Sequence, residues 1–149
     1  MPAIFEHPLT VSATEMDELG HANNQVYLAW LNAAALAHTA AQGWPQEAYL
    51  QRGAGWLVRK HEIEYLAPAR AGESLIVRTW VATMERATSL RRYEVVRQKD
   101  GARVAVASTL WAFVDYKTGR LQRIPAEIAR AFEVVPDGAE PPRRQGRQE

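Results

Sequence analysis

The sequence has no cysteine among its 149 residues, and this absence removes several kinds of chemistry at once. A disulfide framework, a thiolate nucleophile and a cysteine-ligated zinc site are all excluded. The four histidines are scattered through the chain, and no second ligand stands at helical spacing from His38, so we expect no metal site. The lack of cysteine also fits a reducing compartment, and we therefore expect a cytoplasmic protein.

A strong net charge is missing as well, since 18 Lys and Arg residues are nearly balanced by 17 Asp and Glu. Nothing in this balance indicates binding to nucleic acid or to an acidic membrane surface. The N-terminal residues MPAIFEHPL lack the basic and apolar regions of a signal peptide. The apolar segment 26–42 is short for a membrane span and carries Asn32 and His38, so we expect neither a membrane nor a nucleic-acid partner.

What the sequence does have is an unusually apolar helix, preceded by a polar loop, between residues 17 and 43. From Val26 to Gln42 seven side chains are alanine, a strong helix former. Asn23 and Asn24 are suited to cap the start of this helix, and Gly43 to end it. A helix that is apolar around most of its circumference must be covered on several sides, so we expect the rest of the chain to pack around it.

The second half of the chain predicts β-strands, because it is rich in valine, isoleucine and aromatic residues and is divided by turn signals. The expected strands are Leu9–Ala13, Trp56–Leu66, Leu75–Met84, Leu90–Gln98 and Val104–Tyr116. The links between the four long strands are short, which favours an antiparallel meander, with a hairpin at Asp100-Gly101. Short helices are expected at Gln46–Gln51 and, after Pro125, at Ala126–Phe132.

These elements indicate an α+β fold in which a curved antiparallel sheet wraps around the central helix. Residues 1–135 form a single domain in this interpretation, and the polar residues 136–149 form a disordered tail. One helix cannot cover both faces of the sheet, and both faces of the second long strand carry large apolar side chains. The pattern therefore predicts an oligomer, unless the C-terminal helix covers the remaining face.

Two motifs give the chain a family resemblance. The first is Asp17-x-x-Gly20-His21-x-Asn23-Asn24-x-x-Tyr27-Leu28-x-Trp30, and the second is Ile63-x-Tyr65-x-x-Pro68-Ala69-x-x-Gly72-Glu73. Together they resemble the hotdog-fold acyl-CoA thioesterases of the 4-hydroxybenzoyl-CoA thioesterase type, over roughly residues 8–132. The resemblance implies a hotdog fold, a five-stranded antiparallel sheet around a central helix. It also implies a homodimer, or a tetramer formed as a dimer of dimers, with active sites at the dimer interface.

The resemblance further implies hydrolysis of acyl-CoA thioesters to a free acid and CoA by a carboxylate before the central helix, without a metal or other cofactor. Asp17 occupies that position, as a nucleophile or as a general base for water; a loop acid that helps to cap the helix is the alternative. The backbone N–H of Asn24 matches the group that polarises the thioester carbonyl. His21 matches a histidine of the related acyl-acyl-carrier-protein thioesterases, but Leu19 replaces their asparagine, which favours a structural role for His21.

The remaining questions concern the substrate. CoA phosphates require basic side chains, for which Arg59 and Lys60, and Arg91 and Arg92, are candidates, although each pair of neighbours points to opposite faces of its strand. Two other functions remain open from the sequence: a thioesterase acting on acyl carrier protein, and an acyl-CoA-binding protein with the same fold but no catalysis. The acyl group itself cannot be read from one helix.

Overall fold

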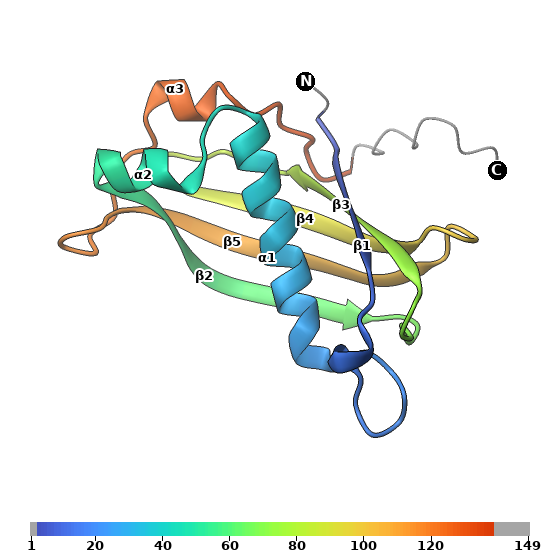
Figure 1. Ribbon diagram of the computed structural model, residues 1–149. Helices are drawn as coiled ribbons and strands as arrows, with labels where there is room; N and C mark the ends of the chain where they lie inside the picture. Colours follow the sequence, from blue (N-terminus) through green and yellow to red (C-terminus); the bar gives the residue numbers. More distant parts are fainter. Residues whose placement is uncertain (1–2, 139–149) are drawn as a thin grey trace.

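The computed structural model describes residues 3–138, in which an antiparallel sheet of five strands packs against the long helix (Figure 1). The strands are β1 (Phe5–Thr10), β2 (Ala54–Tyr65), β3 (Ser74–Val81), β4 (Thr88–Arg97) and β5 (Arg103–Asp115). The helices are α1 (Asn24–Ala41), α2 (Gln46–Arg52) and α3 (Ala126–Ala129), with a 3-10 turn at Ala13–Glu15. The predicted α+β architecture, a five-stranded antiparallel sheet with a central helix, is confirmed.

The strand order is β1-β3-β4-β5-β2, which differs from the predicted meander at one point. Strands β3, β4 and β5 are paired in succession, but β2 pairs with β5 rather than with β3. The link 66–73 instead crosses the end of the sheet, where the N–H groups of Leu66 and Ala67 both donate to the Val104 carbonyl oxygen. The meander prediction was wrong for β2, because a short link fixes the direction of the next strand and not its neighbour.

Smaller differences concern the ends of elements. The first strand covers Phe5–Thr10 rather than Leu9–Ala13, and α3 ends at Ala129 rather than at Phe132. Asp137, which the prediction placed in the disordered tail, lies in an ion pair with Arg92 at 2.8 Å. The rest of the predicted tail, from 139 onward, lies outside the described residues.

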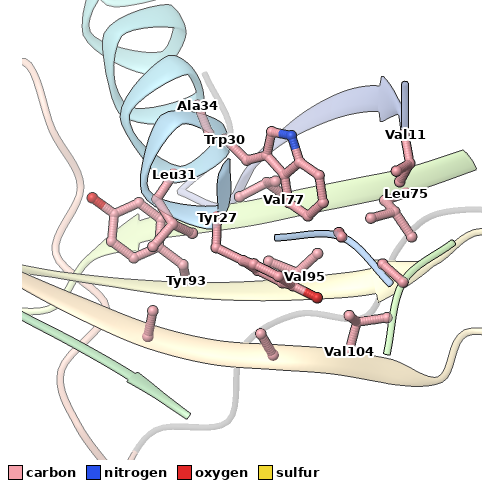
Figure 2. Packing of buried hydrophobic residues seen from close by; sticks show 14 of the residues in the cluster. Val11, Tyr27, Trp30, Leu31, Ala34, Leu75, Val77, Tyr93, Val95 and Val104 are labelled. Carbon is pink, nitrogen blue, oxygen red and sulfur yellow. The ribbon is translucent and has the colours of Figure 1, made fainter. Parts of the chain in front are cut away.

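The main core lies between α1 and one face of the sheet (Figure 2). From α1 it receives side chains spaced three or four residues apart, which form the buried face of the helix: Tyr27, Trp30, Leu31 and Ala34. Opposite them lie inward-facing residues of β3, β4 and β5: Leu75, Val77, Tyr93, Val95 and Val104. A second cluster joins α2 and α3 to the sheet through Tyr49, Phe113 and Ile128.

One side of α1 remains exposed in the single chain. Leu28, Asn32 and Leu36 follow at intervals of four residues, and Leu28 and Leu36 are each 40% exposed. Helix α3 packs on the same side of the sheet as α1, because Phe132, just beyond it, contacts His38 of α1 (Figure 1). Helix α3 therefore does not cover the opposite face of the sheet, and the side of α1 that carries Leu28 and Leu36 stays exposed. Within residues 3–138 no helix is long and apolar enough to cross a membrane.

Candidate functional site

Asp17 lies in a tight loop that is closed by backbone hydrogen bonds immediately before α1. The N–H of Asp17 donates to the carbonyl oxygen of His21 at 2.7 Å, and the next residues inward, Met16 and Ala22, form an isolated β-bridge. The carboxylate is also held, since its Oδ1 accepts hydrogen bonds from the N–H groups of Leu19 (2.9 Å) and His21 (3.1 Å). Asp17 is exposed, and its Oδ2 accepts no hydrogen bond from residues 3–138.

The same hydrogen bonds fix the loop against the start of α1. The N–H of Asn23 donates to the Glu15 carbonyl oxygen, and the Asn23 side chain caps the helix by accepting from the N–H of Gln25 at 2.9 Å. The predicted cap at Asn23 is confirmed. Asn24 is therefore the first helical residue rather than the cap, and its N–H meets no acceptor in the described part of the chain. An unpaired amide at the positive end of a helix dipole is suited to stabilise negative charge.

His21 contributes to the loop through its backbone. Its carbonyl accepts from Asp17 and its N–H donates to the Asp17 carboxylate, whereas its partly buried imidazole forms no hydrogen bond with the described residues. Leu19, at the tip of the loop, is 78% exposed. The structure thus brings Asp17, His21 and Asn24 together at one junction of loop and helix, with Asp17 and Asn24 supplying the two chemically free groups.

A cavity of about 190 Å³ lies beside the C-terminal half of α1, between this helix, α2 and the sheet; we call it the α1 cavity. Its apolar wall is formed by large side chains from several elements: Leu36, Trp56, Val81, Met84, Trp111 and Phe132. Three of its hydroxyl groups are already bonded to the protein, since Thr39 donates to the Trp44 carbonyl, Tyr49 accepts from the Trp56 indole, and Ser89 donates to the Thr83 carbonyl. The exposed Asn32 lies at its rim.

Arg91 reaches this cavity from β4 and is only 6% exposed. Its Nη1 donates to His38 Nδ1 at 2.9 Å and to Thr79 Oγ1 at 3.0 Å. Burial, and secondarily the nearby Arg91 charge, lower the pKa of His38 from 6.5 to about 3. His38 is therefore a neutral acceptor at physiological pH, held between the rings of Phe5 and Phe132.

The four candidate CoA-binding residues do not share one surface. Arg59 and Lys60 are exposed on β2, where Lys60 also forms an ion pair with Glu62 at 3.4 Å. Arg92 pairs with Asp137 and, as the neighbour of the inward-pointing Arg91, lies on the opposite face of β4. Arg91 is buried, so it is not available to a CoA phosphate at the protein surface. The alternation of buried residues along β4, which places Arg91 with Ser89 and Tyr93, is the sequence signal for its inward position.

Comparisons with known proteins agree with this architecture. The family model of the thioesterase-like superfamily matches residues 11–132. The acyl-CoA thioester hydrolase YbgC of Escherichia coli is 26% identical over 129 residues, which cover 87% of this chain and 96% of that protein. The chloroplastic acyl-acyl-carrier-protein hydrolase FATB2 of Cuphea viscosissima is 23% identical over 136 residues, and the match spans only 33% of that protein.

Solved structures extend the comparison to the fold. The hypothetical protein TT1821 of Thermus thermophilus has a TM-score of 0.79 and 30% identity, with 86% of this chain and 96% of that chain covered. A variant of 4-hydroxybenzoyl-CoA thioesterase with an aspartate replaced by asparagine, in complex with 4-hydroxybenzoyl-CoA, also has a TM-score of 0.79, at 19% identity, over 88% of this chain and 99% of that chain. The fold is the predicted hotdog fold, and the chain belongs to the thioesterase-like superfamily.

Proposed function

We propose that this protein is an acyl-CoA thioesterase, which hydrolyses R-CO-S-CoA with water to the free acid and CoA. One observation carries the proposal: an oriented carboxylate and an unpaired helix N-terminal amide meet at the same junction of loop and helix. Thioester hydrolysis needs these two groups, one to deliver an oxygen nucleophile and one to stabilise the oxyanion. The similarity to an acyl-CoA thioester hydrolase over nearly its whole length supports the same substrate class.

The geometry of Asp17 fits either of two mechanisms. In the first, the free Oδ2 attacks the thioester carbon, CoA leaves as the thiolate, and water hydrolyses the resulting mixed anhydride. In the second, Oδ2 takes a proton from a water molecule that attacks the same carbon. In both, the Asn24 N–H donates to the carbonyl oxygen as it becomes negative, while the Leu19 and His21 amides hold Oδ1 and aim Oδ2.

The central test is Asp17→Asn, assayed by thiol release from short, long-chain and aromatic acyl-CoAs. An asparagine Oδ1 still accepts from Leu19 and His21, so the loop keeps its shape while the nucleophile or base is lost. We expect kcat to fall by about 10²- to 10⁴-fold, the usual contribution of such a group. Glu18→Gln, which neutralises the neighbouring exposed acid of the same loop, is the matched control and should retain activity. Equal turnover by Asp17→Asn and wild type would remove Asp17 from the chemistry.

An acyl-carrier-protein substrate is the second candidate, and the similarity to the plant hydrolase favours it. The carrier and CoA share the pantetheine thioester, so the same chemistry serves both. Hydrolysis of acyl-acyl-carrier-protein in preference to the matching acyl-CoA would establish this alternative. A folded protein that binds acyl-CoA but hydrolyses neither substrate would instead be a binding protein.

We also place the active enzyme in a homodimer, alone or within a dimer of dimers, in the cytoplasm. The exposed stripe Leu28, Asn32 and Leu36 is the surface that a second copy would cover. If a two-fold axis passes beside Asn32, two antiparallel α1 helices place Asn24 of one opposite Ala40 of the other. The free amide of one protomer then lies near the α1 cavity of its partner.

Two observations test this assembly. Light scattering on the purified protein should give twice the mass of the chain or a multiple of it, and Leu36→Glu should shift the mass toward the monomer because it places a charge on the covered stripe. A wild-type monomer with full activity would contradict the arrangement.

The exposed Arg59 and Lys60 on β2 remain our candidates for contact with CoA phosphates.

A further inference from the structure

The most buried arginine of the described chain has no acidic partner. Arg78 pairs with Glu6 and Glu94, and Arg97 pairs with Glu73 and Asp100, yet both of these are more exposed than Arg91. Within residues 3–138, Arg91 donates hydrogen bonds only to His38 and Thr79, and both of these side chains are neutral. A buried charge is costly unless an opposite charge or strong hydrogen bonds compensate it, so this position calls for an anion.

The C-terminal end of α1 compensates only part of this charge. His38 belongs to the last turn of α1, so Arg91 lies beneath the negative end of the helix dipole. That end carries the equivalent of roughly half an elementary charge, which tolerates a cation but does not neutralise it. A guanidinium has five N–H donors, and both bonds that Arg91 makes in the described structure come from Nη1. Nε and Nη2 therefore remain available.

Arg91 is part of the lining of the α1 cavity, so these donors can bind a group that lies in this cavity. Aromatic and aliphatic side chains form most of the remaining wall, and the hydroxyl groups of Thr39 and Ser89 are already bonded to carbonyl oxygens. An apolar cavity of about 150 Å³ is enough for benzene, so one of about 190 Å³ suits an aromatic ring or a short hydrocarbon chain.

We propose that the α1 cavity receives an acyl group whose far end carries a carboxylate, and that Arg91 binds this carboxylate through the planar, two-pronged contact typical of arginine. This inference rests on the proposed thioesterase function, whose substrate class it narrows. The apolar wall binds the hydrocarbon part of the acyl group, and Arg91 selects a second carboxylate against a methyl group.

The test compares acyl-CoAs that differ only at the far end. Adipoyl-CoA is paired with hexanoyl-CoA, and 4-carboxybenzoyl-CoA with 4-methylbenzoyl-CoA, and kcat/KM is measured for each. We expect wild type to favour the carboxylate member of at least one pair by about 10- to 100-fold, the range for a hydrogen bond to a charged group. In Arg91→Met this ratio should collapse toward one or below, and Arg91→Lys should retain part of it. Arg97→Met, the same change on the same strand, should leave the ratio as in wild type.

A binding measurement keeps the inference separate from the catalytic proposal and from the folding of the variants. Chemical-shift titration of wild type with benzoate and with its neutral analogue benzamide reads the Arg91 site without turnover. Preferential binding of benzoate near Arg91 supports the anion site even if no thioester is hydrolysed, a result that would overturn only the proposed function. Hydrolysis with no preference for the carboxylate member, together with equal binding of benzoate and benzamide, overturns the inference and leaves the thioesterase proposal intact.

Discussion

The buried contact between His38 and Arg91 predicts a specific dependence of stability on pH. In the folded protein burial and the Arg91 charge keep His38 neutral, with a pKa lowered from 6.5 to about 3. In the unfolded chain the same imidazole takes up a proton near its ordinary pKa. The unfolded state therefore binds more protons between these two values, and His38 makes the free energy of unfolding fall as the pH decreases through this window.

The size of the effect follows from the gap between the two pKa values. Each pH unit within the window lowers the free energy of unfolding by about 1.4 kcal/mol. At about pH 4.5, two units below the unfolded pKa and still above the folded one, the loss attributable to His38 is therefore about 3 kcal/mol. This is a large part of the total stability of a typical domain, about 5–15 kcal/mol.

The substitution His38→Gln isolates the contribution of His38 to the pH dependence of stability. Glutamine presents a neutral oxygen that can accept from Arg91, but it does not titrate. We expect the variant to be less stable than wild type at neutral pH, because it loses the ring contacts with Phe5 and Phe132. The difference in free energy of unfolding between the two proteins should shrink by about 3 kcal/mol on going to about pH 4.5. The carboxylates titrate in both proteins and cancel in the comparison.

Urea unfolding followed by tryptophan fluorescence, at several pH values from about 7 to about 4.5, measures the difference directly. Asn23→Ala, which removes the N-cap of α1 but no titrating group, serves as the control and should show the same pH dependence as wild type. If the free energies of unfolding of wild type and His38→Gln change in parallel with pH, the reasoning is refuted. Such a result would mean that His38 binds protons equally in the folded and unfolded states.

Two further predictions concern the loop before α1 and the assembly. Asn23→Ala removes the N-cap of α1 and should cost about 1 kcal/mol of unfolding free energy in urea titrations, whereas Asn23→Asp should retain most of it. If the active site combines the loop of one protomer with the α1 cavity of the other, then mixing inactive Asp17→Asn with inactive, cavity-filled Met84→Trp should restore about a quarter of wild-type activity through heterodimers. Thiol release that stays at the level of either variant alone would contradict the shared site.

The elements that sequence patterns predict well are those whose signals are local. The apolar residues of α1, its cap at Asn23 and the turn at Asp100-Gly101 act within a few positions, and the structure confirms all three. Strand β1 was harder to predict because it contains Glu6, His7 and Pro8. A strand at the sheet edge pairs on one side only, with β3, so it tolerates such residues.

The position of β2 could not be predicted, because strand order depends on contacts between distant residues. The link 66–73 must pass three strand spacings, about 14 Å, to reach β3. Eight extended residues span about 26 Å, so the short link permits this crossing as readily as a hairpin. What fixes its path are bonds to other segments: Ala69 accepts from the N–H of Ala22, and Gly72 donates to the Val11 carbonyl. Neither is visible in the link itself.

The two parts of the proposed site differ in the same way, one depending on local signals and the other on contacts between distant residues. Asp17 and Asn24 lie seven residues apart, and their loop is closed by its own backbone, so a motif is sufficient to find them. Alternation along β4 places Arg91 on the inner face, but only the folded structure shows that neutral His38, and no carboxylate of the described chain, faces it.

The two groups that would bind negative charge lie at opposite ends of the α1 dipole. Its N-terminus presents the free amide of Asn24, where negative charge is stabilised, and its C-terminus lies over the buried guanidinium of Arg91. A bound acyl group with a carboxylate at its far end would present one anion to Arg91 and develop the other at the thioester carbonyl. The carboxylate charge is present before the reaction, so Arg91 should govern which acyl groups bind. The charge on the carbonyl oxygen appears only in the transition state, so the junction at Asp17 and Asn24 should govern how fast these groups react.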